Sequence, residues 1–497
     1  MKKITLLFLL VPLVNFAQWT QLGNTVAGEF ASDRAGNVSL SSDGTVMAIG
    51  ARYNNGNGTK SGHVRVFGYE ANQWIQIGED INGEAIDDLS GQALSLSGDG
   101  TTVSIGALFN DGNGRNSGHV RIFKNVNGTW NQIGTDIDGE ALANNSGGAV
   151  SINHNGTIVA IGARYNDANG IQDTGHVRVY QYEAGIWEQL GNDIDGAANH
   201  NFFGTSVAIS ADGYTVAIGA PYNNNKNGED AGHVQIYQYT SGSWNQIGDD
   251  INGEAEDDNS GEVISLSDDG STIAIGARSN DGNGSNSGHV RVYKNISGSW
   301  TQLGSDIDGP SSNKFFPSSL SLNADGTTLA IGASFVHSSV VNSGSTHVMN
   351  YKANNWSLVE TVISGANEND YSGFSVSISN DGNTVAIGSE LNSDNGLESG
   401  YVRVLTNSQV LSNSTLKVQD FRAFPNPTQN NVQINLGNNY TNVLLTITNA
   451  IGQTISQKNY TNTNILTVPI YGSNGVYYLE INTSTGKNEV LKIVKQD

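Results

Sequence analysis

The sequence predicts an all-β protein, a seven-bladed β-propeller followed by a small C-terminal antiparallel β-sandwich. Of its 497 residues, 61 are glycine and only 14% are charged, a composition typical of turns and short strands rather than of long amphipathic helices. Seven tryptophans recur at a nearly constant interval. Each interval holds four strand-like segments, and four antiparallel strands per repeat describe a propeller blade.

The tryptophans define the repeat. Successive tryptophans are 55, 56, 57, 57, 56 and 56 residues apart, at Trp19, Trp74, Trp130, Trp187, Trp244, Trp300 and Trp356. In most repeats an Ile or Leu follows three residues later in the same predicted strand. This pattern favours packing between blades over stacking on carbohydrate, the alternative use of a periodic tryptophan.

The fifth repeat shows the predicted strands of one blade. They are residues 263–267, 271–277, 288–293 and 300–304, each alternating or rich in β-branched residues and bounded by turn formers. The first two are joined through Asp269-Gly270, which is the signal of a two-residue hairpin and recurs in the other repeats. A single blade cannot bury enough apolar surface to fold alone, so neighbouring blades must supply the remainder.

The ends of the repeat array predict how the ring closes. The seventh repeat ends at residues 400–405 without a tryptophan strand, whereas WTQLG at 19–23 has no partner before it. We therefore expect the N-terminal strand to complete the last blade, pairing two otherwise exposed edges.

The domain organisation follows from shifts in composition. Residues 1–17 read as a secretory signal peptide, with two lysines, an apolar run and a small residue, so cleavage is expected between Ala17 and Gln18. That run is too short to span a membrane, and no later segment qualifies. The propeller is expected at 18–406, a linker at 407–420 and the second domain at 421–497.

The composition also limits chemistry and partners. No cysteine is present, so disulfides and thiolate chemistry are excluded. Between residues 18 and 408 there are 16 basic and 43 acidic residues, a net charge of −27. Such a body repels phosphate backbones, so nucleic acid is not an expected partner, and cations are more plausible. The chain is expected to be a monomer.

One repeat carries a family likeness. Residues 202–239 contain Phe203-Gly204, then Gly219-Ala220-Pro221 and a closing Gly-x-Val-x-x-Tyr, and this unit resembles the FG-GAP repeat of integrin-type propellers. The likeness extends over about residues 19–406, with degenerate motifs in the other units. The acidic loop that holds calcium in that family is reduced here to a hairpin, so those ligands are not carried over.

The C-terminal segment has a different texture and a distinct set of motif residues. They are Pro425, Asn426, Pro427, Gly452, Gly475, Tyr477, Lys492 and Lys495. With these residues the segment resembles the sorting domain of the type IX secretion system of Bacteroidetes. The resemblance implies interaction with the type IX machinery, passage through the outer membrane, and release or attachment at the cell surface. An ordinary accessory domain is the alternative.

Acidic loops are the candidate cation sites. Two loop families, exemplified by residues 78–91 and 110–118, should meet at one end of the propeller because successive strands alternate in direction. They contain Asp or Asn pairs at i, i+2, a spacing of oxygens that suits calcium. The candidates are Asp136, Asp138, Asp193, Asp195, Asp250, Asn252, Asp306 and Asp308. The alternative is that these residues only form turns on an acidic surface.

Periodic histidines and a few irregular segments complete the candidates. A histidine recurs in the third strand of six repeats, at His63, His119, His176, His233, His289 and His347. A shared metal cluster is disfavoured because blades diverge, so each histidine is expected to pack within its own blade. Residues 201–203 and 315–317 break the repeat with paired phenylalanines, which indicates either packing between blades or an asymmetric ligand patch.

These observations favour a secreted or surface-exposed, non-catalytic binding or adhesion module for a glycan or protein partner, with calcium as an optional cofactor. No nucleophile, base and orienting group fall together in the sequence. The alternative is an extracellular hydrolase or lyase of polysaccharides, since propellers also carry enzymes. A purely structural surface-layer role is the third hypothesis.

Overall fold

The computed structural model describes residues 19–312, 314–336, 340–359, 361–407, 421–424, 428–450, 453–483 and 488–496. The chain divides into two compact units, Met1–Gln409 and Val410–Asp497. The predicted signal peptide with its Ala17–Gln18 cleavage site, and residues 408–420 of the predicted linker, lie outside the described residues.

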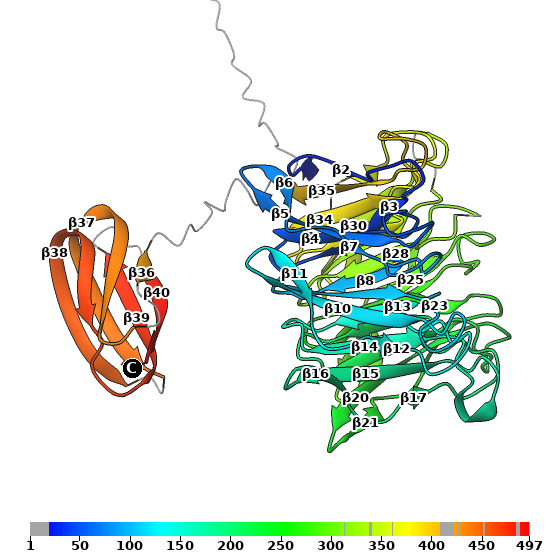
Figure 1. The fold of residues 1–497 in the computed structure, drawn as a ribbon, viewed down its shortest axis with the longest axis horizontal. Helices are drawn as coiled ribbons and strands as arrows, with labels where there is room; N and C mark the ends of the chain where they lie inside the picture. Colours follow the sequence, from blue (N-terminus) through cyan, green and yellow to red (C-terminus); the bar gives the residue numbers. More distant parts are fainter. Residues whose placement is uncertain are drawn as a thin grey trace, which may run out of the picture. The chain divides into compact units, whose positions relative to one another are not determined.

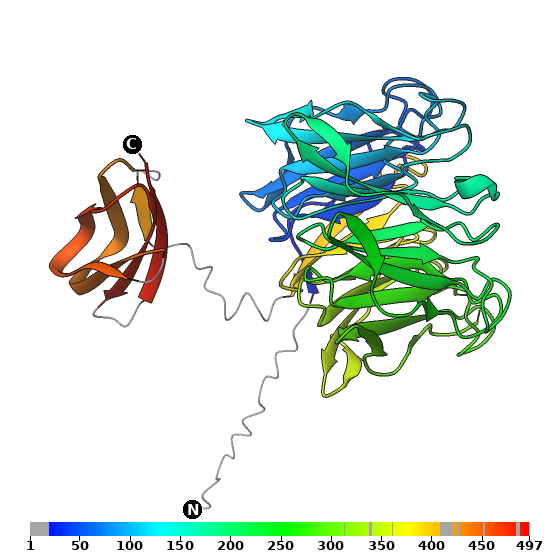
Figure 2. The same ribbon diagram turned by 90° about the horizontal axis from the view of Figure 1, so that it is seen from below.

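The larger unit consists of seven antiparallel sheets, confirming the predicted all-β propeller. Figure 1 and Figure 2 show the blades following one another in sequence order. Each sheet has four strands in order and a two-residue fifth strand paired with the third. Among the described residues, the helical content is one 3-10 turn, η1 (Ala168–Gly170).

The strands of the first six blades have the following bounds. Blade 1 contains β3 (Ala35–Leu40), β4 (Val46–Ala51), β5 (His63–Glu70), β6 (Gln73–Gln76) and β7 (Ile81–Asn82). Blade 2 contains β8 (Ala93–Leu96), β9 (Thr102–Ala107), β10 (His119–Val126), β11 (Thr129–Gln132) and β12 (Ile137–Asp138). Blade 3 contains β13 (Ala149–Ile152), β14 (Ile158–Ala163), β15 (His176–Glu183), β16 (Ile186–Gln189) and β17 (Ile194–Asp195). Blade 4 contains β18 (Ser206–Ile209), β19 (Thr215–Ala220), β20 (His233–Thr240), β21 (Ser243–Gln246) and β22 (Ile251–Asn252). Blade 5 contains β23 (Ser260–Leu266), β24 (Thr272–Ala277), β25 (His289–Ile296), β26 (Ser299–Gln302) and β27 (Ile307–Asp308). Blade 6 contains β28 (Ser319–Leu322), β29 (Thr328–Ala333), β30 (Ser345–Lys352), β31 (Asn355–Leu358) and β32 (Ile363–Ser364).

Blade 7 is assembled from both ends of the propeller. It combines β33 (Ser375–Ile378), β34 (Thr384–Ser389) and β35 (Tyr401–Asn407) with β1 (Trp19–Gln21) and β2 (Val26–Ala27). Strand β1 pairs antiparallel with β35, placing Trp19 opposite Asn407, and β2 lies beside β35 in Figure 1. The predicted closure by the N-terminal strand is confirmed.

The Asp-Gly turns, with Asn155-Gly156 in their place in blade 3, join the first and second strands of each blade by a longer connection than expected. In blade 5 the ladder ends with Ser267 N–H donating to the Thr272 carbonyl, so four residues rather than two form the loop. The Asp269 carboxylate accepts from the Ser267 hydroxyl and the Ser271 N–H, which stabilises this wider turn.

The seven turns are linked to one another around the ring. Backbone N–H groups donate to the turn of the next blade in a closed series, from Ser42 to Gly98, Asp99 to His154, His154 to Ala211, Ala211 to Asp268, Asp268 to Ala324, Ala324 to Asn380, and Asn380 back to Ser42. This series ties all seven blades together at one end.

Blades pack on each other through the second strand and the tryptophan. In β14 all six residues are buried, because both faces of the strand contact neighbouring sheets. A Cβ on Gly106 would lie 2.0 Å from the Gly147 carbonyl oxygen, so only glycine permits this approach. Six tryptophan indoles donate to a carbonyl of the preceding blade or of the N-terminal segment at 2.7–2.9 Å, from Trp74, Trp130, Trp187, Trp244, Trp300 and Trp356. The tryptophans therefore connect blades.

The smaller unit is one bent antiparallel sheet. Its strands are β36 (Arg422–Phe424), β37 (Asn431–Asn449), β38 (Thr454–Pro469), β39 (Gly475–Thr483) and β40 (Asn488–Lys495). The long β37–β38 pair shifts register between Asn435 and Tyr440, so the sheet folds over a single core. Thr428 bonds to both Val494 and Gln496, which joins the first and last edges. The expected sandwich is thus a sheet that wraps both sides of its core.

Candidate functional site

The long loops gather at one end of the propeller, opposite the Asp-Gly turns (Figure 1). Between blades 1 and 2, the Asp87 and Ser90 N–H groups donate to the carbonyls of Thr59 and Ser61. The Asn57 side chain donates to the Gly83 carbonyl at 3.0 Å. The loop after the second strand and the loop after the tryptophan strand therefore form one surface, which we call the loop face.

Part of the acidity of the loop face is structural. Asp88 is 2% exposed and accepts from the Ala85 N–H and the Asn110 side chain at 3.0 and 3.1 Å. The same arrangement recurs around Asp33, Asp258 and Asp370. These carboxylates hold loop backbone, as the turn-forming alternative expects.

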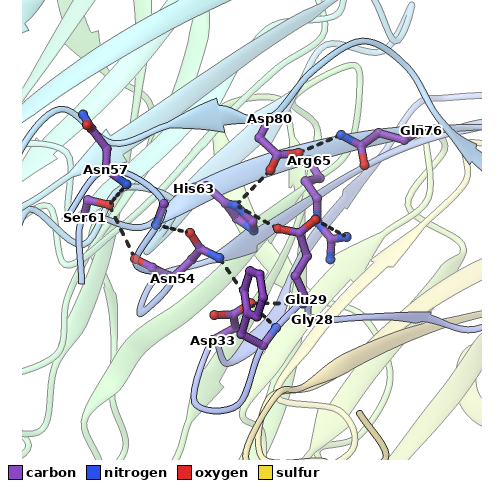
Figure 3. Close-up of polar contacts among 12 residues, drawn as sticks. Gly28, Glu29, Asp33, Asn54, Asn57, Ser61, His63, Arg65, Gln76 and Asp80 are labelled. Atoms are coloured by element: carbon purple, nitrogen blue, oxygen red, sulfur yellow. Dashed lines mark hydrogen bonds and ion pairs between the residues drawn. The ribbon is translucent and has the colours of Figure 1, made fainter. Parts of the chain in front are cut away.

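A histidine begins the third strand of five blades, and in four of them two carboxylates converge on it. Figure 3 shows the first group, in which His63 Nδ1 lies 3.9 Å from Glu29 Oε2 and 3.7 Å from Asp80 Oδ2. In the other three groups the corresponding distances are 3.7–3.8 Å, for Glu84–His119–Asp136, Glu140–His176–Asp193 and Glu254–His289–Asp306. In each group the three candidate ligand atoms lie within 4.8 Å of one another.

Both carboxylates are oriented by a second partner. Oδ1 of Asp80 accepts from Gln76 Nε2 at 2.8 Å, which leaves Oδ2 directed at the histidine. Oε1 of Glu29 faces Arg65, whose guanidinium also donates to the Ala27 carbonyl. The same glutamine and arginine partners recur in the other three groups.

The histidines of these groups are neutral at neutral pH. Each side chain is only 1–2% exposed. Burial, reinforced by the neighbouring arginine, lowers the pKa of His63, His119, His176 and His289 to about 4. Burial also raises the pKa of Glu84 and Glu254. A neutral imidazole can accept a cation at its unprotonated nitrogen.

The structure separates the members of the predicted calcium pairs. Asp136, Asp193 and Asp306 join the groups above, together with a histidine and a glutamate that the pairing hypothesis did not include. Asp138, Asp195 and Asp308 are exposed residues of the two-residue strands and lie outside these groups among the described residues. Asn252 has the equivalent position in blade 4, where its carbonyl accepts from Arg291.

Blade 4 lacks the glutamate. Ala197 replaces it, and Gln235 replaces the arginine. There His233 Nδ1 approaches Asp250 Oδ2 to 3.4 Å. The hydrogen bond from His233, with those from Gln246 and Gln235, holds the pKa of Asp250 well below its usual range. Where no glutamate is present, the histidine therefore lies closer to its aspartate and bonds to it directly.

His347 does not belong to the histidine series. Strand pairing places Ser345 opposite Ala333, as His289 is placed opposite Ala277. His347 is two residues further on, at the position of Arg291, and its ring meets Phe316 edge-on with centroids 5.6 Å apart. All six histidines lie in third strands, as expected, but His347 has a different register, because sequence spacing does not fix strand register when a loop changes length.

The paired phenylalanines divide their roles. Phe203 and Phe316 are 1% exposed and pack in the core, as the packing hypothesis expects. Phe202 instead contacts Tyr165 and Tyr222 with ring centroids 5.2 and 5.3 Å apart, and Phe315 meets Phe335 at 6.2 Å. The first member of each pair, Phe202 or Phe315, thus contacts aromatic side chains instead of packing in the core.

Open grooves lie between blades. One of about 460 Å³, between blades 4 and 5, is lined by Lys226, Asp249, Asp250, Tyr293 and Trp300. A second of about 290 Å³, between blades 1 and 2, is lined by the equivalent segments, including Asp80, Arg121 and Trp130. Both grooves are lined by a tryptophan with carboxylates beside it.

Asymmetric polar contacts also occur at the Asp-Gly turns. Asp268 accepts from Asn380 Nδ2 at 2.7 Å, and Ser42 Oγ lies 3.3 Å from His154 Nδ1. Burial raises the pKa of Asp268. These contacts join residues from alternate blades.

The predicted sorting residues fall in the smaller unit. Tyr477 is buried in β39 and donates to the Ser473 carbonyl, while Gly475 begins the same strand. Lys492 lies in β40, and Lys495 donates to the Ile470 and Gly472 carbonyls. Pro425, Asn426, Pro427 and Gly452 are outside the described residues. No helix among the described residues is long and apolar enough to cross a membrane.

Fold and sequence define a β-propeller joined to a C-terminal export domain. Residues 422–496 match the family described as a secretion system C-terminal sorting domain. Residues 193–237 and 357–404 match the FG-GAP repeat family. The chain therefore carries FG-GAP repeats and a type IX sorting domain, which directs it to the cell surface or the extracellular space.

More distant comparisons add no functional information. No curated protein matches the sequence. The periplasmic gluconolactonase of Pseudomonas aeruginosa is 12% identical, with 66% of this chain and 85% of that chain covered and a TM-score of 0.42. The β-propeller domain of the Trilobed protease from Pyrococcus furiosus is 8% identical, covering 75% and 89%, with a TM-score of 0.39. AofleA from Arthrobotrys oligospora is 12% identical, covering 71% and 91%, with a TM-score of 0.38. The blade count rests on the strand pairing itself.

Proposed function

We propose that the exported propeller is a non-catalytic binding or adhesion module that takes a glycan or protein partner on its seams and loop face. The observation that carries this proposal is the repetition of similar open grooves at separate seams, each with a tryptophan and carboxylates. An aromatic wall with polar groups beside it suits a sugar ring, and equivalent sites on one molecule give avidity.

A binding screen tests this function. The chain from residue 18 to 497 is applied to a glycan array and to extracellular matrix proteins, with and without calcium, and we expect saturable binding. Lys226→Ala, at the larger groove, should weaken that binding, whereas Lys352→Ala, in blade 6, should not. Failure to bind any glycan or matrix protein under either condition would favour a purely structural surface role.

The alternative of a polysaccharide hydrolase or lyase is supported by one observation. Asp268 is a carboxyl whose pKa is raised by burial, close to a histidine at the turn end of the ring, and such groups serve as general acids. Incubation with a panel of polysaccharides tests this alternative. Release of oligosaccharides that is lost in Asp268→Asn would replace the binding function with catalysis.

A further inference from the structure

The four Glu–His–Asp groups of the loop face have unused ligand atoms directed at one point. His63 is 1% exposed, and its Nδ1 has no hydrogen-bond partner although two carboxylate oxygens face it. The distances of 3.7–3.9 Å are too long for hydrogen bonds. Two ligand atoms on a zinc ion, at 2.0–2.2 Å from it, are about 3.3–3.6 Å apart, so each imidazole–carboxylate distance is within a few tenths of an ångström of that required, and the three ligand atoms lie within 4.8 Å of one another.

The surroundings of each group match a supported metal site. One oxygen of the aspartate is held by a glutamine and one oxygen of the glutamate by an arginine, so that the remaining oxygens face the imidazole (Figure 3). Such outer partners orient ligands in metal sites. Because imidazole nitrogen is one of the ligands, the set favours a divalent transition ion such as zinc over calcium, which takes oxygen ligands.

Each group also spans a seam between blades. Glu84 follows β7, the two-residue strand of blade 1, whereas His119 and Asp136 belong to blade 2. Glu29 follows β2, which is paired into blade 7, whereas His63 and Asp80 belong to blade 1. The first group therefore lies at the seam where the ring closes.

We infer that these four groups are binding sites for divalent transition-metal ions, and that each bound ion clamps two neighbouring blades. The first site reinforces the closure made by the N-terminal strands. The seam between blades 3 and 4, where Ala197 replaces the glutamate, has no such site.

Zinc titration of the chain from residue 18 to 497 tests the assignment. Calorimetry with zinc alone should give four equivalents per chain, and an excess of calcium should not displace them. Glu84→Gln, which changes a side chain that is 43% exposed, should reduce the stoichiometry to three. Glu79→Gln, an exposed residue of the same segment, and His233→Gln in blade 4 should leave it at four. Zinc binding that is absent, or that is unchanged in Glu84→Gln, overturns the inference.

Two further experiments keep the test valid even if Glu84→Gln destabilises the protein. One adds a fifth zinc site, and the other compares melting temperatures. Ala197→Glu combined with Gln235→Arg rebuilds the missing group, so a fifth equivalent is expected. Zinc should raise the melting temperature of the wild-type chain by a larger amount than that of Glu84→Gln. If Glu84 only pairs with Arg121, zinc will shift both melting temperatures equally, and the double variant will stay at four equivalents.

Discussion

At the residue scale, the partly buried imidazole of His347 predicts sensitivity to acid. Burial lowers the pKa of this ring to about 4, from 6.5. Between these values the unfolded chain binds the proton and the folded chain does not, so the folded state loses stability as pH falls through this window. Each pH unit is worth at most about 1.4 kcal/mol for one such group.

Urea unfolding of His347→Gln and of the wild-type chain at pH 7, 5.5 and 4.5 measures this effect. The free energy of unfolding of the variant should improve relative to the wild type as pH falls, because glutamine does not titrate. The other buried histidines are present in both proteins and cancel in the difference. A difference that stays constant over the three pH values would show that the folded state protonates this ring freely.

The residues of the metal-like groups show what sequence reasoning could and could not reach. The histidines and Asp136, Asp193 and Asp306 are visible as periodic residues. The aspartates suggested a cation, whereas the histidines were expected only to pack within their own blades. Glu84 and its equivalents recur as well, in a Gly-Glu pair, but they belong to the loop of the preceding blade. Many acidic residues recur, and the rotation between adjacent sheets decides which of them lie beside a histidine. The repeat length in the sequence carries no information about that rotation.

At the scale of elements, the closing strand should control the stability of the ring. Leu22, immediately after β1, donates its N–H to the Val404 carbonyl at 2.7 Å, and its side chain packs in the core of blades 7 and 1. Leu22→Pro removes this ladder bond and bends the strand, whereas Leu22→Ala removes only side-chain packing. We expect the proline variant to lose about 1–3 kcal/mol more than the alanine variant.

Thermal and urea unfolding of both variants, with limited proteolysis of the N-terminal segment, compare these effects. Gln21→Ala, an exposed side chain of the same strand, serves as control and should behave as the wild type. Equal stability of the proline and alanine variants would mean that the ring does not depend on this hydrogen bonding.

The elements of the propeller could be predicted because each blade repeats the same pattern. In blade 5 the predicted segment 271–277 corresponds to β24 (Thr272–Ala277), and the segment 288–293 overlaps the first part of β25 (His289–Ile296). The two-residue strands such as β27 (Ile307–Asp308) were missed, since two residues are too short for any periodicity. The Asp-Gly turn was placed correctly but given too short a loop, because a side-chain hydrogen bond to Asp269 decides its width.

At the scale of the whole molecule, the two units have separate cores and different tasks. The core of the smaller unit contains only residues between Phe421 and Ile493, and the propeller clusters contain none of these. The acidic balance also belongs to the propeller, since residues 409–497 hold six basic and four acidic residues. Stability and export should therefore be separable by truncation.

Ending the chain at Asn407 tests this separation in the native host and in vitro. The truncated protein should keep the melting temperature of the propeller, because every blade strand, including the β1–β35 pair, is retained. It should nevertheless accumulate in the periplasm, because the sorting domain at residues 422–496 is absent.

Fusing residues 410–497 to a reporter that enters the periplasm should carry the reporter to the cell surface or medium, as measured by surface labelling and fractionation. Surface display of the truncated chain at the wild-type level would show that the propeller holds an export signal of its own, and a lowered melting temperature would show that the smaller unit supports the ring.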